Sequence, residues 1–465
     1  MGDSFRPDIS AQLGPWRRWR LRAAERVVTG IMRRLLPYGL STHPVTLDRL
    51  PAARPDHRYA LYLHVPFCET LCTYCSFHRV PFRTILAERY FDDLEREMHL
   101  AADLGYRCDT LYVGGGTPTV SMDRLLGALT LARELFGVKH VSCETHAHHL
   151  RPDIAGRLAG HVQRLSVGVQ TLDAEILRRM RRDPDRFSTD TTLAALRAMN
   201  PLFPTLNVDL IFNLPGQTPA GLANDLDRVL ATGVRQVTTY PLMSSPNVAR
   251  DMGREFGRPP ASREYEMFRL IEARMREEGM RASSPWCFSR PDETMIDEYI
   301  VDAPEYVGLG SGAFSLLDGS WYVNTFSLTE YSARLEKGRM SVERMRRFRP
   351  WELMHYRLMM GLFGLDLKRA GVPTARHAPE GFLLAGELLL LRGAGAFQRG
   401  PSGRSMPSHS GRYLALAMMR EFFAGMNRVR DESRATLPAW QRGELEAFGG
   451  PDHQCPLDGH QEKRS

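Results

Sequence analysis

Three cysteines stand close together near the start of the chain and could bind a metal cluster. Cys68, Cys72 and Cys75 lie in the segment Tyr62-Leu-His-Val-Pro-Phe-Cys-Glu-Thr-Leu-Cys-Thr-Tyr-Cys. Thiolate is a soft ligand, and cysteine thiolates hold the irons of iron–sulfur clusters. Three thiolates can bind three irons of a [4Fe–4S] cluster and leave the fourth iron open to a small molecule. The spacing therefore predicts a cluster that acts on a bound molecule.

Two other uses of cysteine fit this pattern less well. Zinc sites usually have four ligands, either as two cysteine pairs or as cysteines with histidines at matching spacing. Disulfides are not expected, because no secretory signal is present and the other cysteines are scattered singly. These are Cys108, Cys143, Cys287 and Cys455.

The length and the charge limit the classes of protein to consider. With 465 residues, the chain can form one large catalytic domain and a smaller one. It has no run of 18 apolar residues, so no membrane-spanning helix is expected. Residues 1–58 hold eleven arginines against five acidic residues, which leaves only +1 of the net charge of +7 on the rest of the chain. A nucleic-acid partner is therefore not expected.

The segment 16–36 has the pattern of an amphipathic helix. Its apolar face holds Leu21, Ala24, Val27, Val28, Ile31, Met32 and Leu35, and its charged face holds Arg18, Arg22, Glu25, Arg26 and Arg33. An arginine-rich face with flanking tryptophans suits contact with anionic lipids. Packing on the catalytic domain explains the pattern equally well, since further arginines interrupt the apolar stripe. Both alternatives stay open.

From Tyr59 onward, short apolar strands alternate with helical stretches. Strands are expected at 60–65, 110–113, 140–144, 164–169, 206–212 and 236–240. This alternation predicts a parallel sheet that curls into a full or partial barrel, with ligands at the carboxyl ends of its strands. Residues 340–434 are expected to form a small helical or winged-helix-like domain. The expected division is an N-terminal extension (1–58), a barrel domain (59–339), this helical domain and a mobile tail (435–465).

Polar residues follow several of the expected strands. The Gly-rich turn 114–119 would let backbone amides approach an anionic or zwitterionic ligand. Glu144, Gln170 and Asp209 each stand at or near a strand end, where they would converge on one mouth, although each could instead cap a helix.

A cluster of histidines follows Glu144. His146, His148 and His149 could suggest a metal site, but no carboxylate or cysteine nearby in the sequence completes a ligand set. A polar loop near the mouth is therefore the favoured interpretation.

Over residues 59–430, the chain resembles the oxygen-independent coproporphyrinogen III oxidase-like family of radical S-adenosyl-L-methionine (SAM) enzymes. The resemblance lies in the cysteine segment, in Gly114–Thr119, in Arg164-Leu-Ser-Val-Gly-Val-Gln170, in Asp209-Leu-Ile-Phe-Asn-Leu-Pro-Gly-Gln217 and in Gly308-Leu-Gly-Ser-Gly-Ala-Phe-Ser315. It implies a partial (β/α)6 barrel of the TIM type and a [4Fe–4S] cluster held by the three cysteines, with SAM on the open iron. It also implies two SAM molecules and a low-potential electron donor such as flavodoxin or ferredoxin.

The same resemblance assigns roles to individual residues. It implies SAM contacts at Tyr62, Tyr74, Gly115, Gly116, Thr117, Glu144, Gln170, Arg182, Asp209, Leu242 and Phe314. Three of these, Tyr62, Glu144 and Gln170, are also expected to be catalytic.

One departure from the family bears on the reaction. The oxidase has a further cysteine two positions after the third cluster ligand, and this chain has Phe77 there. The resemblance then favours a class C radical SAM methyltransferase, which methylates an sp² carbon. The expected acceptor is the menaquinone ring, at its C8 position. The alternatives are a tetrapyrrole enzyme, either oxidase-like or a haem-degrading methyltransferase, and a non-catalytic haem chaperone.

The expected acceptor site and cellular location follow from the same comparison. Tyr240, Met243, Trp286 and Phe326 are expected to line a mouth on which a flat quinone or tetrapyrrole could stack. We expect a cytoplasmic protein, with residues 16–36 available for peripheral contact with the inner membrane face.

Overall fold

The computed structural model describes residues 14–182, 188–292, 303, 305–366, 379–399 and 405–442. Most of the tail expected at 435–465 lies outside these residues, and its described part includes the short helix α15 (Ala439–Arg442). Within the described ranges, no helix is long and apolar enough to cross a bilayer.

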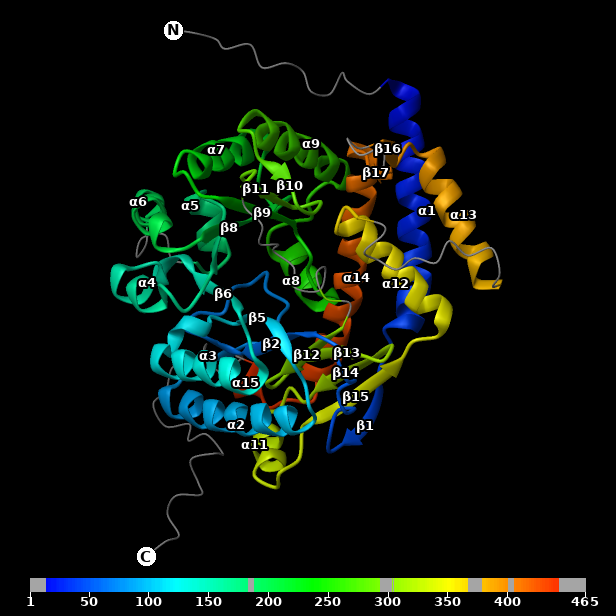
Figure 1. Ribbon diagram of the computed structural model, residues 1–465. Coiled ribbons are helices and arrows are strands. Elements are labelled where there is room, and N and C mark those ends of the chain that lie inside the picture. The colour runs from blue at the N-terminus through cyan, green and yellow to red at the C-terminus, as the bar shows by residue number, and fades with distance from the viewer. Residues whose placement is uncertain are drawn as a thin grey trace, which may run out of the picture.

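Six parallel strands form the centre of the molecule (Figure 1). In spatial order they are β2 (Tyr59–Val65), β5 (Cys108–Gly115), β6 (His140–His146), β7 (Arg164–Gln170), β8 (Thr205–Phe212) and β9 (Gln236–Pro241). Most residues of these strands are buried, as is typical of parallel strands covered on both faces. The predicted fold class, an α/β protein with a partial (β/α)6 barrel, is confirmed.

Helices connect the strands and cover the outside of the curved sheet (Figure 1). They are α2 (Thr84–Asp103), α3 (Met122–Phe136), α4 (Pro152–Leu158), α5 (Ala174–Arg179), α6 (Thr189–Met199), α7 (Pro219–Leu230) and α9 (Ala261–Glu277). Helix α8 (Pro246–Glu255) lies instead beside α14 (His409–Arg434). The amphipathic α2 shows why such helices form here, because its apolar residues recur at helical spacing and are buried against the sheet.

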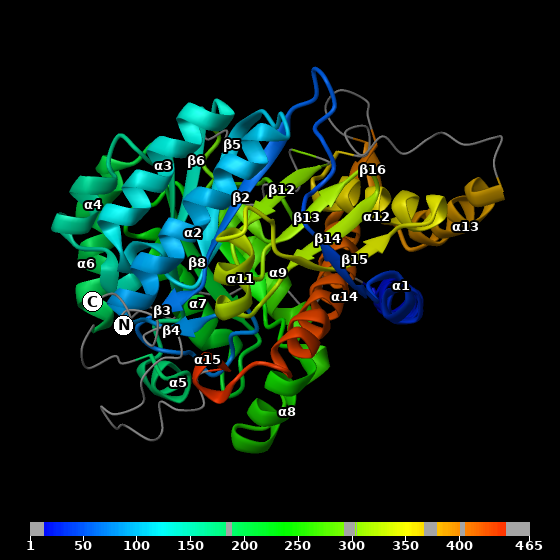
Figure 2. The ribbon, with the colours of Figure 1, turned by 90° about the horizontal axis from the view of Figure 1, so that it is seen from below.

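The sheet continues beyond the barrel at both edges (Figure 2). Next to β2 lies β12 (Tyr306–Leu309), which is parallel to it, and then β13 (Phe314–Leu317), β14 (Ser320–Asn324), β15 (Val342–Arg347) and β1 (His43–Leu47), which are antiparallel. Next to β9 lie β11 (Cys287–Ser289) and β10 (Arg281–Ala282). The sequence analysis did not predict these added strands. Helix α11 (Leu328–Leu335) follows β14.

A helical layer packs on one side of the barrel (Figures 1 and 2). It contains α12 (Pro350–Phe363), α13 (Pro379–Gly393), the hairpin β16 (Phe397–Arg399) and β17 (Ser405–Pro407), and α14 (His409–Arg434). Helices followed by a short hairpin match the predicted C-terminal helical or winged-helix-like domain.

The N-terminal helix α1 (Pro15–Gly39) lies along α14 in this layer. Leu21, Ala24 and Val28 are each at most 2% exposed, so most of the predicted apolar stripe is used in packing. Val27 differs from the prediction, because its side chain is 45% exposed. The arginine side of α1 contributes as well, since Arg33 donates two hydrogen bonds of 2.9 Å to the carboxylate of Glu421 on α14. Of the two alternatives for this helix, packing is the one observed.

Candidate functional site

A cavity of about 270 Å³ opens at the carboxyl ends of the barrel strands. All eleven residues assigned to SAM by resemblance line it, and so do the three cysteines Cys68, Cys72 and Cys75. The residues assigned to SAM come from the ends of β2 and β5–β8, from the cysteine loop, and from the segments after β7, after β9 and at the start of β13. Residues spread over 250 positions of the chain therefore face one space. SAM binding by these residues stays a prediction.

The three cysteines lie on the loop between β2 and α2. A two-residue parallel pairing, β3 (Phe67–Cys68) with β4 (Val80–Pro81), closes this loop on itself. Cys68 and Cys72 are buried, and Cys75 is half-buried. Burial, together with the other two thiols, raises the pKa of Cys68 to about 12. Such a thiol gives up its proton when a metal binds its sulfur.

Two partly buried guanidinium groups, those of Arg79 and Arg182, stand beside the thiols. Arg79 donates a hydrogen bond of 2.6 Å to the carbonyl of Cys72. Burial alone would lower the pKa of Arg182, but Tyr74 and the cysteine thiols raise it above its ordinary value. Fixed positive charge next to three soft sulfur donors fits a negatively charged iron–sulfur cluster.

The hydroxyl of Tyr62 is neutral and is held in place through His64 and His78. The Nε2 atom of His64 lies 2.9 Å from the carbonyl oxygen of His78, which can only accept, so this nitrogen carries the hydrogen. Its Nδ1 atom then accepts from the Tyr62 hydroxyl at 2.8 Å. Burial lowers the pKa of His64 to about 4, and burial followed by the Glu144 charge raises the pKa of Tyr62 far above neutral pH. Tyr62 therefore presents a fixed, uncharged side chain to the cavity.

The Gly-rich turn lines the cavity and packs closely against its neighbours, and its contact with a ligand stays a prediction. The amide of Gly115 donates to Glu144 at 3.2 Å, and those of Gly116 and Thr117 donate at 2.7 Å to the carbonyls of Val65 and Phe67. These three amides are thus engaged within the protein. The glycines are needed because a Cβ on Gly116 would lie 2.5 Å from the Phe67 carbonyl oxygen.

The polar residues at the strand ends are held in place by neighbours. Glu144 accepts a hydrogen bond of 2.8 Å from the Tyr112 hydroxyl. Asp209 accepts from Ser166 and from Asn207, each at 2.8 Å.

Gln170 and Arg182 also line the cavity. Gln170 ends β7 with a φ of 74°, a left-handed conformation that turns the chain sharply at the mouth. Arg182 donates to the carbonyl of Gly168 at 2.5 Å and lies over the ring of Tyr74.

The apolar wall of the cavity differs from the prediction. Tyr240 and Met243 line the cavity as expected, but Trp286 and Phe326 do not. Both are fully buried, Trp286 with its ring centroid 4.5 Å from that of Phe363 and Phe326 with its ring centroid 4.7 Å from that of His78.

Helix α14 supplies the part of the wall that sequence reasoning missed. Its cavity-lining residues are Phe422, Phe423, Met426, Asn427 and Arg430. The Arg430 guanidinium lies 4.7 Å from the ring centroid of Phe77 and 5.5 Å from that of Phe314. The sequence predicted a helical domain here, but no local signal showed which face of α14 would meet a cavity built from residues far earlier in the chain.

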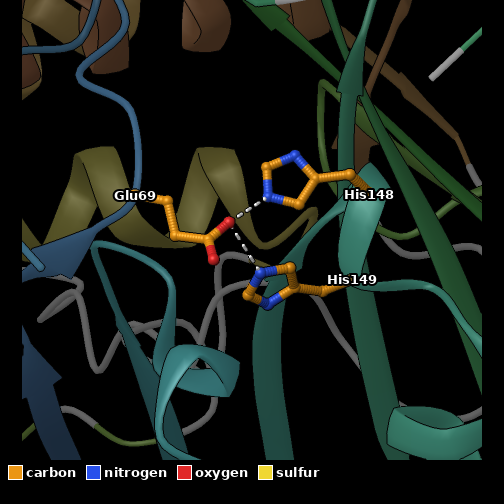
Figure 3. Close-up of side chains that lie close together, drawn as sticks. All are labelled: Glu69, His148 and His149. Carbon is orange, nitrogen blue, oxygen red and sulfur yellow. Dashed lines mark hydrogen bonds and ion pairs between the residues drawn. The ribbon is translucent and has the colours of Figure 1, made fainter. Parts of the chain in front are cut away.

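The histidines after Glu144 require a second correction. His146 lines the cavity, whereas His148 and His149 do not. A carboxylate that the sequence analysis did not foresee, Glu69, lies within hydrogen-bond distance of both of them (Figure 3). This carboxylate comes from a segment 79 residues before His148.

Comparisons with known proteins agree with the fold and the cysteine motif. The family model of the radical SAM superfamily matches residues 62–229. The heme chaperone HemW of Mycobacterium tuberculosis is 31% identical over 289 residues, 58% of this chain and 72% of that protein. The oxygen-independent coproporphyrinogen III oxidase of Salmonella typhimurium is 26% identical over 309 residues, 62% of this chain and 67% of that protein. The chain belongs to the radical SAM superfamily.

Relatives within that superfamily include coproporphyrinogen oxidases and haem chaperones. The structure of coproporphyrinogen III oxidase HemN from Escherichia coli aligns with a TM-score of 0.66 over 79% of this chain and 91% of that chain, at 22% identity, and so shares the fold. Membership of the superfamily implies a [4Fe–4S] cluster and SAM, and the three cysteines on the cavity would hold that cluster. SAM bound there would supply radical chemistry, and the residues that line the cavity would hold the reactants.

Proposed function

We propose that this protein is a radical SAM enzyme that modifies a tetrapyrrole. The observation that carries the proposal is that one cavity is lined by the cluster cysteines, by the residues assigned to SAM and by an aromatic wall with a guanidinium group. A tetrapyrrole is flat and conjugated and bears carboxylate groups. The named relatives support this class, since they are coproporphyrinogen oxidases and haem chaperones.

The wall made by α14 suits such an acceptor. Phe422, Phe423 and Met426 offer apolar surface on which a flat ring can stack. Arg430 donates to Asn427 at 2.5 Å, and Asn427 donates in turn to the carbonyl of Met243 at 2.9 Å, so the guanidinium is fixed between α14 and the end of β9. A fixed guanidinium is a good partner for a carboxylate.

We assign the reaction to methyl transfer, with a second SAM molecule as methyl donor. Phe77 supports this assignment, because it stands where the oxidase has a further cysteine. Its side chain is 41% exposed and stands beside Arg430 at the cavity. An aromatic side chain can pack on an acceptor but cannot exchange a proton with it.

The test is an anaerobic turnover assay with the cluster-reconstituted protein, SAM and a reductant. Haem, coproporphyrinogen III and a short-tailed naphthoquinone are offered separately, and products are identified by mass. We expect a tetrapyrrole that gains a methyl group, together with 5′-deoxyadenosine and S-adenosylhomocysteine. Cys68→Ala/Cys72→Ala/Cys75→Ala should bind no cluster and give no product. Loss of carboxyl groups would instead indicate oxidase activity, and haem retention without SAM consumption a chaperone.

A second candidate is methyl transfer to the menaquinone ring. The observation in its favour is the exposed aromatic pair at the start of α1, where Trp16 is 76% and Trp19 63% exposed beside several arginines. Such a surface suits a membrane in which a quinone dissolves. Methylation of the naphthoquinone without methylation of either tetrapyrrole would establish this candidate and reject the first.

A further inference from the structure

Two histidines and one carboxylate converge on the outer side of the cysteine loop. Glu69 directly follows the first cluster cysteine, and His148 and His149 follow β6 (Figure 3). The Nε2 atom of His148 lies 3.0 Å from Oε2 of Glu69, and that of His149 lies 3.3 Å from the same oxygen. One ligand atom from each residue can be chosen so that all three lie within 4.8 Å of one another.

This spacing suits a single divalent ion. Ligand atoms at about 2.0–2.2 Å from a zinc ion are about 3–4 Å apart. Two imidazoles and one carboxylate, with a position left for water, form a common set for zinc and for ferrous iron. We propose that Glu69, His148 and His149 bind a divalent first-row transition metal ion that is separate from the iron–sulfur cluster.

The residues around the two histidines support this assignment. The Nδ1 atom of His149 lies 2.8 Å from the hydroxyl of Thr119, which is 2.7 Å from that of Thr145. When Nε2 binds a metal, Nδ1 carries the hydrogen and donates it to Thr119, which donates onward to Thr145. Metal-binding histidines usually have such a partner on the second nitrogen, because it fixes the ring and its tautomer. His149 is only 7% exposed, so its ring cannot turn away.

The ion would join two segments that the fold only brings near each other. One is the cysteine loop at Glu69, and the other is the turn Ala147–His149 at the end of β6. Glu69 is partly exposed, so an ion can reach the site from solvent without passing through the SAM cavity. Because Glu69 is adjacent to Cys68, the metal would restrain the loop that holds the cluster.

The experiment uses the full-length protein with its cluster reconstituted anaerobically. One equivalent of zinc is added, the protein is desalted, and zinc and iron are measured by mass spectrometry. Zinc K-edge X-ray absorption then identifies the ligands. We expect about one retained zinc per chain with only nitrogen and oxygen ligands at about 2.0–2.2 Å, unchanged iron, and a higher melting temperature.

Variants decide whether the zinc occupies this site. Glu69→Gln and His148→Ala should lose the zinc and the rise in melting temperature but keep the iron. Thr119→Val should weaken zinc affinity by about 10- to 100-fold. His140→Ala is the matched control, because His140 is an exposed histidine at the other end of β6 and should keep the zinc. Equal zinc retention by Glu69→Gln, or sulfur ligands at about 2.3 Å, would overturn the proposal and place the ion on other groups.

Discussion

Asp209 shows how single residues at the cavity are prepared for a ligand. Ser166 donates to one oxygen of its carboxylate and Asn207 to the other, each at 2.8 Å. The carboxylate therefore has a fixed orientation before any ligand arrives. Its side chain loses little conformational entropy when a ligand binds. At Gln170 the backbone takes a left-handed turn at the mouth, with a φ of 74°.

We predict that Asp209→Asn and Gln170→Ala reduce SAM binding and turnover much more than cluster content. Losing a charge-assisted contact costs about 1.5–3 kcal/mol, or roughly tenfold to more than a hundredfold in affinity. SAM affinity and iron content are measured on the same samples. Asp190→Asn is the control, because Asp190 pairs with Arg228 on the outer surface. A loss of iron in proportion to activity would make these residues structural.

The lowered pKa of His64 should make the free energy of unfolding depend on pH. Burial lowers its pKa from 6.5 in the unfolded chain to about 4 in the fold. Below pH 6.5, the unfolded chain therefore binds a proton that the folded protein does not, and stability falls as the pH falls toward 4. Its full contribution is present above the unfolded pKa.

The prediction is tested by urea unfolding at pH 7.5 and 5.5. The loss of stability between these values should be smaller in His64→Asn than in the unmodified protein, by about 1.4 kcal/mol. His140→Asn, at an exposed position, should leave the loss unchanged. An equal loss in His64→Asn would show that His64 titrates alike in both states.

At the scale of elements, the turn after β5 is limited by close packing. A Cβ on Gly116 would lie 2.5 Å from a backbone oxygen of the cysteine loop, and backbone cannot move aside as a flexible side chain can. We predict that Gly116→Ala destabilises the protein by about 1–3 kcal/mol and lowers cluster yield. Gly127→Ala is the control, because nothing lies within 4 Å of that Cβ in the middle of α3. Thermal unfolding and iron content should separate the two variants, and equal behaviour would contradict this account.

The elements that the sequence predicted are those with a strong local pattern. The strands β2 and β5–β9 are apolar runs between helices, and their expected ranges agree with the structure to within a few residues. The strands β12–β14 escaped prediction, because they are four or five residues long and are stabilised mainly by pairing with neighbours. Short strands have no periodicity of their own long enough to recognise.

Some residues of the site could be predicted from the sequence and others could not. The cysteines and the strand-end residues follow from motifs within single segments. Glu69 and Arg430 could not be found, because each acquires its role from a partner far away in the chain. Glu69 contacts histidines about 80 residues later, and Arg430 contacts Phe77, which stands about 350 residues earlier in the chain.

At the scale of the whole molecule, α1 joins the two ends of the chain. Leu21 and Val28 are buried on α14, whereas Trp16 and Trp19 are exposed. We predict that Leu21→Ala lowers the melting temperature, since filling that site stabilises the fold by about 2–5 kcal/mol.

The exposed tryptophans allow membrane contact to be tested without disturbing the fold. Trp16→Gln/Trp19→Gln should keep the melting temperature but weaken binding to anionic liposomes in a flotation assay. High salt should weaken it further by screening the arginines. Liposome binding as tight as that of the unmodified protein would leave α1 as a packing helix alone.

The pairing of β2 with β12 sets an order for biogenesis. The cysteine loop leaves the ribosome early, yet its supports include β12 beside β2 and Ser311, whose hydroxyl lies 3.2 Å from Nε2 of His78. Roughly 240 residues separate these segments, which is about 12–48 s of synthesis. Ribosome-stalled chains that end before β12 should therefore capture no iron, whereas released full-length chains should. Cluster delivery is then expected only after β12 has been made, and a cell making this protein must keep three thiols reduced until that point.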